Sequence, residues 1–234
     1  MTLLDSPDGG WLVPPEFREK TPHAYGRSNK PGRIKPVECI VYHYTASPRG
    51  ADKYGAGEKR IRSWLSGARG VSSTHFVVLR NGVIIQGAPL QARTWHAGQA
   101  YWADPVTGEL RKYVNNFSIG VDLENVGHLS RKGFGWVDTY GRQYDDGSAG
   151  PFVTSERRAW EPYTAPQMDA ACALTARLVE AFPHLVNEHY ADTKLRLVGH
   201  EHVAPTRKVD PGPAFDWDAI LEAANVAGGL NVCE

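Results

Sequence analysis

The chain has 234 residues, of which 41% are hydrophobic, and its 26 lysine and arginine residues equal its 26 aspartate and glutamate residues in number. A chain of this length and composition can bury a sizeable core, so we expect one folded domain. A formal net charge of zero gives no overall attraction to nucleic acid or to an anionic membrane, and we expect no nucleic-acid partner.

The first ten residues, MTLLDSPDGG, lack the basic start and the apolar run of a secretory signal. The chain also contains no apolar stretch long enough to cross a bilayer. We therefore expect a protein that is cytoplasmic as synthesised and has no membrane span. The sequence leaves the oligomeric state open.

Residues 1–37 are predicted to form an irregular N-terminal arm. They carry six prolines, a Gly-Gly pair and scattered charges, a composition that argues against an independent domain. We expect residues 38–234 to form the main folded domain, with an insertion at about 128–163.

The domain begins with an apolar run. The segment ECIVYHYTAS (38–47) is rich in β-branched and aromatic residues, which predicts a buried strand with His43 near its exit. The segment GEKRIRSWLSG (57–67) has Ile61, Trp64 and Leu65 at helical spacing. It predicts a short amphipathic helix that ends at Gly67.

Two further strand regions follow. In THFVVLRNGVIIQ (74–86), the pair Asn81-Gly82 joins two apolar runs and predicts a hairpin with a type I′ turn, in which both central residues have positive φ. The segment NFSIGVDLENVG (116–127) alternates apolar residues with polar ones. This period predicts a strand in which Asp122 and Glu124 share one face.

Residues 164–183 are predicted to form the longest helix. Thr164 and Gln167 have the spacing of a capping box. The predicted inner stripe is Met168, Cys172, Thr175, Val179 and Phe182.

The C-terminal part of the chain adds a strand at 194–200 and a last helix capped by Asp216. Strands and helices therefore alternate along the chain, with one clear hairpin. We predict an α/β fold with a central mixed β-sheet flanked by helices. The Gly-rich and aromatic-rich insertion at 128–163 is too long for a structureless loop, and it is either a lip beside a substrate or a structural elaboration.

Three residues have the chemistry of a metal site. His43 and His200 each stand at the end of a predicted strand, and Asp210 follows ten residues later on a proline-stiffened loop. Two imidazoles and one carboxylate suit Zn²⁺, and three protein ligands leave a fourth position for water. Spacing alone leaves the alternative of ordinary buried or surface histidines open, because nine histidines form such pairs by chance.

Glu124 and Lys208 are candidates for the remaining roles of a zinc hydrolase. Glu124 lies at the end of a predicted strand, where a partly buried acid can act as a general base. Lys208 lies two residues before Asp210 and can support an oxyanion. The alternative is that both charged side chains are ordinary surface residues.

The motifs taken together resemble those of zinc-dependent N-acetylmuramoyl-L-alanine amidases of type 2, which share a fold with phage lysozyme-amidases and peptidoglycan recognition proteins. The resemblance covers roughly residues 38–125 and 164–224. It rests on five segments in the family's order: VYHYTAS, STHFVVLRNGVIIQ, TWHAG, NNFSIGVDLEN and GHEHVAPTRKVDPGPAFDW.

The resemblance implies zinc ligands at His43, His200 and Asp210, and catalytic roles for Glu124 and Lys208. The family's phage and recognition-protein branch usually has cysteine at the third ligand, so Asp210 places the resemblance nearer to the muropeptide-recycling branch. Trp95, His96 and Asn125 are the candidate substrate contacts. Asn125 departs from the glycine that is frequent in the family.

The implied reaction is hydrolysis of the amide between N-acetylmuramic acid and L-alanine, in peptidoglycan or in muropeptides. Action at the cell wall would need phage lysis or a dedicated delivery machine. Two alternatives remain at this point: a non-catalytic peptidoglycan-binding module of the same fold, and a zinc peptidase that cuts within the stem peptide.

Overall fold

The computed structural model describes residues 10–13, 18–19, 36–50, 57–68, 72–145, 150–186 and 196–229. Its strands are β1 (Cys39–Tyr44), β2 (Phe76–Val78), β3 (Ile84–Gln86), β4 (Tyr101–Ala103), β5 (Leu110–Lys112), β6 (Ser118–Leu123), β7 (His128–Lys132), β8 (Gly135–Val137), β9 (Phe152–Val153), β10 (Ala159–Trp160) and β11 (Leu197–Gly199). Its α-helices are α1 (Gly57–Ser63), α2 (Ala165–Ala181), α3 (His200–Val203) and α4 (Trp217–Ala227). Within the described residues, no helix combines the length and apolarity that crossing a membrane requires.

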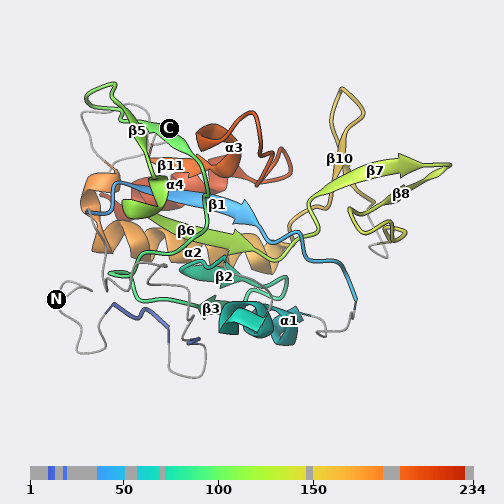
Figure 1. Ribbon diagram of the computed structural model, residues 1–234, viewed down its shortest axis with the longest axis horizontal. Helices are drawn as coiled ribbons and strands as arrows, with labels where there is room; N and C mark the ends of the chain where they lie inside the picture. Colours follow the sequence, from blue (N-terminus) through green and yellow to red (C-terminus); the bar gives the residue numbers. More distant parts are fainter. Residues whose placement is uncertain are drawn as a thin grey trace.

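The central sheet has the strand order β11-β1-β6-β2-β3. The first four strands run parallel, and β3 pairs antiparallel with β2. Helices flank this sheet (Figure 1), which confirms the predicted mixed sheet and α/β class. Because the carboxyl ends of parallel strands meet at one edge, the exits of β1, β6 and β11 lie together there, as expected for a ligand site in an α/β sheet.

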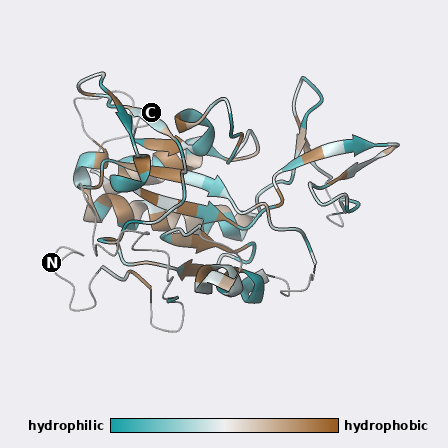
Figure 2. Cartoon of the chain, viewed as in Figure 1, coloured by the Kyte–Doolittle hydropathy of each residue, from teal (hydrophilic) through white to brown (hydrophobic). Residues whose placement is uncertain are grey.

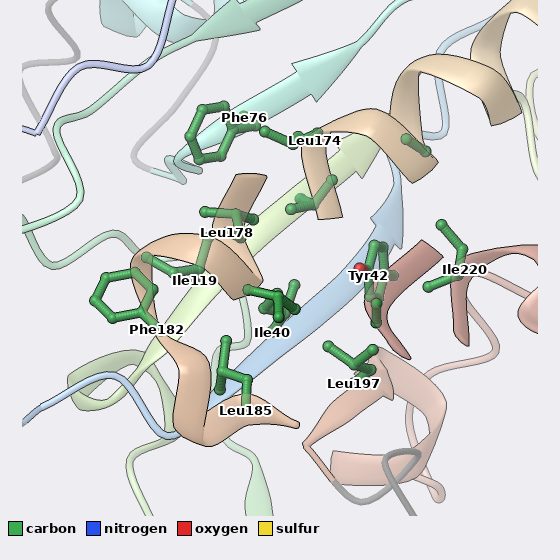
Figure 3. Close-up of a cluster of buried hydrophobic side chains, with 14 of the residues drawn as sticks. Ile40, Tyr42, Phe76, Ile119, Leu174, Leu178, Phe182, Leu185, Leu197 and Ile220 are labelled. Carbon is green, nitrogen blue, oxygen red and sulfur yellow. The ribbon is translucent and has the colours of Figure 1, made fainter. Parts of the chain in front are cut away.

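The main hydrophobic core lies between the sheet and helices α2 and α4. Ile40 and Tyr42 of β1 and Ile119 of β6 point into it, where they meet Leu178 of α2 and Ile220 of α4 (Figure 3). All five side chains are fully buried. The alternation of a strand then sends His43 to the opposite face of the sheet.

The opposite face carries a second, smaller core. Cys39 and Val41 of β1 pack there in one cluster with Trp102 and Phe117. Figure 2 shows apolar colour along the central strands and hydrophilic colour toward the arrowheads of β1 and β6. The change marks the point at which the packed core gives way to polar side chains, and His43 is the first of them on β1.

Helix α2 begins as predicted but presents a different stripe to the core. The Thr164 hydroxyl accepts a hydrogen bond from the backbone N–H of Gln167, as a cap should. The Gln167 amide does not complete a capping box, because it donates to the carbonyls of Val78 and Glu124. These bonds turn Gln167 toward the sheet and bury its helical neighbours Ala171, Leu174 and Leu178. Of the predicted stripe, Met168 and Cys172 are only partly buried, whereas Thr175, Val179 and Phe182 are buried.

The hairpin forms at the predicted place with a different turn. Of the two central residues only Gly82 has positive φ (83°), so the turn is not type I′. The N–H of Gly82 bonds to Leu79 O and that of Leu79 to Val83 O, which defines a three-residue loop with its left-handed residue at glycine. The loop is held against the start of α2, where the Thr164 hydroxyl donates to Arg80 O.

The insertion at 128–163 forms a small sheet of its own, in the order β8-β7-β10-β9. It projects beyond the edge at which β1 and β6 end (Figure 1). Leu129 and Ala159 pack with Val126 in a separate apolar cluster at its base. The described part of the insertion therefore carries strands of its own.

Most of the predicted N-terminal arm, residues 1–37, lies outside the described residues. The described part runs beside β3: the N–H of Leu12 bonds to Gln86 Oε1 at 2.7 Å, and Arg18 forms a β-bridge with Gln86. Gly10 O accepts a bond from Leu90 N. These contacts join the described part of residues 1–37 to Gln86 and Leu90, and the irregular arm as a whole stays a prediction.

We expect Gly82→Ala to destabilise the protein more than Gly108→Ala. Both glycines have positive φ, but an added Cβ at Gly82 would lie 2.7 Å from Pro166 O, whereas at Gly108 it would meet open space. The left-handed backbone alone costs about 1 kcal/mol for alanine, and the clash adds about 1–3 kcal/mol. Urea unfolding of both variants measures the difference. Equal losses would show that the turn does not dock on α2.

Candidate functional site

Three of the predicted site residues converge at the carboxyl edge of the sheet. His43 lies near the end of β1, and His200 opens α3 directly after β11. Asp210 lies on the following loop, where its backbone carbonyl accepts a hydrogen bond from the N–H of Glu201. Nδ1 of His43 lies 2.9 Å from Nδ1 of His200, and Asp210 Oδ2 lies 3.1 Å and 3.0 Å from the two nitrogens. All three residues are buried.

The proton on His200 is placed by a backbone carbonyl. Nε2 of His200 lies 2.9 Å from Ala97 O, and a carbonyl can only accept, so Nε2 carries the hydrogen. The guanidinium of Arg207 lies further from this nitrogen, at 3.4 Å, and donates to the same carbonyl. Nδ1 of His200 therefore turns a lone pair toward the cluster.

A longer chain of hydrogen bonds places the proton on His43. The Ser118 hydroxyl donates to Val114 O at 2.7 Å and so accepts from Nε2 of His96 at 2.9 Å. Nδ1 of His96 is then free to accept from Nε2 of His43, also at 2.9 Å. Nδ1 of His43 consequently presents its lone pair to the cluster as well.

The cluster therefore has the donor set of a metal site. Two imidazole lone pairs and a carboxylate face one another at hydrogen-bonding distance, an arrangement that a shared cation stabilises. Burial lowers the pKa of His200, and the nearby Asp210 offsets this only in part, so the imidazole is held in the neutral form that binds metals. This chemistry fits a divalent ion with mixed nitrogen and oxygen ligands.

Glycine at position 120 makes room for the imidazole of His96. An added Cβ on Gly120 would lie 2.6 Å from Cγ of His96 and 2.8 Å from the Thr74 hydroxyl. The ring thus lies directly against β6, where it can bond to both His43 and Ser118. The sequence analysis named His96 as a candidate substrate contact, and the structure also makes it the hydrogen-bond partner of His43.

The cluster opens into a pocket of about 520 Å³. Lys208, Trp95 and His96, which the sequence proposed for catalysis or substrate contact, all line this pocket with the three cluster residues. Lys208 is partly buried, and Trp95 is 38% exposed. The structure therefore brings these three predicted residues to one place.

Glu124 and Asn125 are not brought to the pocket. Glu124 lines a separate hollow, and its two carboxylate oxygens bind Nη1 and the backbone N–H of Arg80 at 2.8 Å and 3.2 Å. Asn125 is 1% exposed, donates from its amide to Glu161 O and accepts from Gly127 N. Its buried and bonded amide leaves no face for a substrate.

The acid that does reach the pocket is Asp122, which the sequence analysis assigned no role. It pairs in register with His43 across β1 and β6, so the two side chains share one face of the sheet. Burial raises the pKa of Asp122, and the neighbouring His43 offsets this in part. The strand alternation showed that Asp122 and Glu124 share a face, but only the register selects Asp122.

A network of ion pairs around the buried Glu161, which the sequence analysis did not predict, surrounds the separate hollow that Glu124 lines. The fully buried carboxylate of Glu161 binds Nη2 of Arg80 at 2.9 Å, and it also binds Arg49 and the N–H of Val126. Arg80 in turn pairs with Glu124. Glu161 follows β10, so this network fastens the end of the insertion to the exit of β1 and to the hairpin.

Comparison with protein families gives one match: a family described as N-acetylmuramoyl-L-alanine amidase covers residues 33–213. Among curated proteins, the chain is similar to the 1,6-anhydro-N-acetylmuramyl-L-alanine amidase AmpD of Salmonella typhimurium, at 28% identity over 90% of each chain. It is 30% identical to AmpD of Escherichia coli over 62% of this chain and 54% of that protein.

Solved structures give the same picture. A crystal structure of AmpD resembles this fold with a TM-score of 0.60 and 25% identity, covering 92% of this chain and 96% of that one. The amidase AmiD from Escherichia coli, solved with anhydro-N-acetylmuramic acid-L-Ala-D-γ-Glu-L-Lys, has a TM-score of 0.50 at 24% identity and covers 84% of this chain and 61% of that one. The second likeness concerns the fold alone.

We expect Glu161→Gln to lower the free energy of unfolding by about 3 kcal/mol, because it leaves the partly buried Arg80 guanidinium with a weaker partner. Glu156→Gln is the control, since Glu156 pairs with Arg158 on the surface and both side chains are largely exposed. Denaturant unfolding of the two variants provides the measurement. A Glu161→Gln protein as stable as the control would show that the network does not anchor the insertion.

Proposed function

Because the chain belongs to the N-acetylmuramoyl-L-alanine amidase family, we propose that His43, His200 and Asp210 hold its catalytic zinc ion. The enzyme hydrolyses the amide bond between the lactyl group of N-acetylmuramic acid and L-alanine, in muropeptides or peptidoglycan. The observation that carries the site assignment is the convergence of two imidazole lone pairs and a carboxylate in the lining of one pocket.

Zinc bound by these residues would polarise the scissile carbonyl and lower the pKa of the attacking water. The chain's own contribution is to present the ligands in the right protonation state. His96 and the Ala97 carbonyl each hold one Nε2 proton, so neither ligand must be deprotonated at Nδ1 before binding.

Asp122 is the proposed general base, in place of Glu124. Its carboxylate faces the pocket beside His43, whereas Glu124 is engaged by Arg80. In this role Asp122 accepts a proton from the attacking water and passes it to the nitrogen of L-alanine as the amide bond breaks. Its burial limits competition from bulk water for the same proton.

Lys208 is the proposed partner of the oxyanion. Its side chain lines the pocket on the loop that also carries Asp210, so the same segment supplies a ligand and a positive charge. Negative charge develops on the carbonyl oxygen during attack, and a cation already in place stabilises it without rearrangement. The ammonium also lies near enough to Asp122 to favour its ionised form.

The proposed substrate is a muramoyl peptide of the kind that the relatives' names describe. The pocket of about 520 Å³ is within the usual range for small-molecule sites. Trp95 provides an aromatic wall, and Arg207 and Lys208 provide positive charge for an acidic stem peptide. We also propose that residues 38–234 act as one catalytic domain, supported by the buried bonds of Glu161 between the insertion and the main sheet.

We expect Asp122→Asn to lower kcat by about 10²–10⁴-fold, the usual contribution of a positioned acid–base group, while zinc stays bound. Glu124→Gln is the matched control and should keep kcat close to wild type. Mass spectrometry of the products from an anhydromuramoyl tripeptide measures the release of peptide with a free L-alanine amino end.

The opposite ranking of these two variants would restore the role to Glu124. Cleavage within the stem peptide by the wild type would identify a peptidase instead, and binding without cleavage would identify a recognition module. The products therefore distinguish an amidase from a peptidase, and the presence of any cleavage distinguishes it from a recognition module.

A second prediction concerns metal binding itself. We expect His200→Ala to lose the equimolar zinc of the wild type, because the remaining imidazole and carboxylate do not complete a three-ligand site. His202→Ala is the control. That imidazole is half exposed on the same helix, and among the described residues it belongs to no group that could hold a metal ion. Elemental analysis of dialysed protein gives the zinc content without reference to activity. Retention of zinc by His200→Ala would contradict the ligand assignment.

A further inference from the structure

The insertion does not only project away from the domain, because one of its residues returns to the catalytic pocket. Tyr140 follows β8, and its hydroxyl donates to Ala46 O at 2.8 Å. Ala46 belongs to the segment that leaves β1, and Tyr140 lines the same pocket as the metal cluster. The proposed metal ligands, Asp122 and Lys208 line this pocket as well, and none of the roles proposed for them involves Tyr140.

The Tyr140 ring is held in place by its own turn. Oδ1 of the buried Asp138 accepts from the N–H groups of Tyr140 and Arg142, at 2.8 Å and 2.9 Å. The guanidinium of Arg142 lies 5.6 Å from the centre of the ring. A side chain restrained at its backbone, its hydroxyl and one face loses little conformational entropy when a ligand packs on it.

The ring nevertheless remains open to a ligand, since Tyr140 is 50% exposed. Ala46 stands three residues after His43, and three residues span at most about 11 Å. The hydroxyl bond therefore fixes the ring at the rim of the pocket, close to the metal cluster. An aromatic ring that is bonded to this segment and lines the same pocket as the cluster is positioned to contact the part of the substrate next to the reacting carbonyl.

The substrate offers two groups next to that carbonyl. In a muramoyl peptide, the sugar ring is joined to the scissile carbonyl through the short lactyl ether, and the acidic stem peptide extends to the other side. Arg207 and Lys208 supply the positive charge that suits the acidic peptide. An aromatic face suits the apolar C–H face of a pyranose ring instead.

We propose that Tyr140 is a substrate-positioning residue that packs against the muramoyl sugar, so that the insertion supplies the glycan side of the subsite. The proposal rests on the amidase function proposed above and extends it to a residue outside the catalytic machinery. It also decides between the two interpretations of the insertion, in favour of a lip beside the substrate.

Kinetics with two substrates test this role. One is an anhydromuramoyl tripeptide, and the other is a lactoyl tripeptide that has the same scissile amide but no sugar. We expect Tyr140→Ala to raise KM for the muramoyl substrate by about 3- to 10-fold, the range for loss of one aromatic contact, with kcat nearly unchanged. Its kcat/KM for the lactoyl substrate should equal that of the wild type.

Two further variants separate the ring from other effects. Tyr140→Phe removes the hydroxyl bond to Ala46 but keeps the ring and its restraint by Asp138 and Arg142, so its KM should lie between those of the wild type and Tyr140→Ala. Phe134→Ala removes a fully exposed aromatic residue of the same small sheet that does not line the pocket, and it should match the wild type. Thermal unfolding of each variant confirms that the fold is retained.

Three results would overturn the proposal: equal losses of Tyr140→Ala on both substrates, no loss on either, or a Tyr140→Phe variant as impaired as Tyr140→Ala. In each case the wild type still releases peptide with a free L-alanine end, and the amidase function stands. A wild type that releases no such product from the muramoyl substrate would refute the proposed function itself, so the two failures are distinguishable.

Discussion

The site depends on one constraint, which is that a backbone carbonyl can accept a hydrogen bond but never donate one. The carbonyls of Ala97 and Val114 stand at the ends of two hydrogen-bond chains, and they dictate where each imidazole of the cluster carries its proton. Both Nδ1 lone pairs of His43 and His200 then face Asp210. The protonation state that metal binding at these residues would need is thus set by the main chain around the site as much as by the two histidines themselves.

The parallel sheet delivers these groups to one edge, and its register decides which of them meet. The identities of the three cluster residues could be predicted, because imidazole and carboxylate side chains at strand exits and the accompanying motifs are visible in the sequence. The proposed base could not be chosen in the same way. A period of two places Asp122 and Glu124 on one face, and only the pairing of β6 with β1 shows that Asp122 stands opposite His43.

Features with local causes were predictable, and features with distant causes were not. The cap of α2 at Thr164 and the hairpin at Gly82 follow from neighbouring residues, and both occur where expected. The stripe that α2 buries is set by the Gln167 amide, which reaches the carbonyls of Val78 and Glu124. The hairpin loop packs against the start of that helix through residues that lie far away in the sequence. The small sheet formed by residues 128–163 likewise depends on pairings that no short segment reveals.

The double attachment of Glu161 has a consequence for how this enzyme can be altered. Its carboxylate belongs to the insertion by sequence, yet it neutralises Arg80 and Arg49, which belong to the main domain. An excised version of the chain without residues 128–163 would leave those two guanidinium groups without the carboxylate that they share, and among the described contacts Glu124 would remain as the acid paired with Arg80. The small sheet therefore cannot be removed without loss to the main domain. A shortened or chimeric amidase built on this scaffold would need another carboxylate beside Arg49 and Arg80.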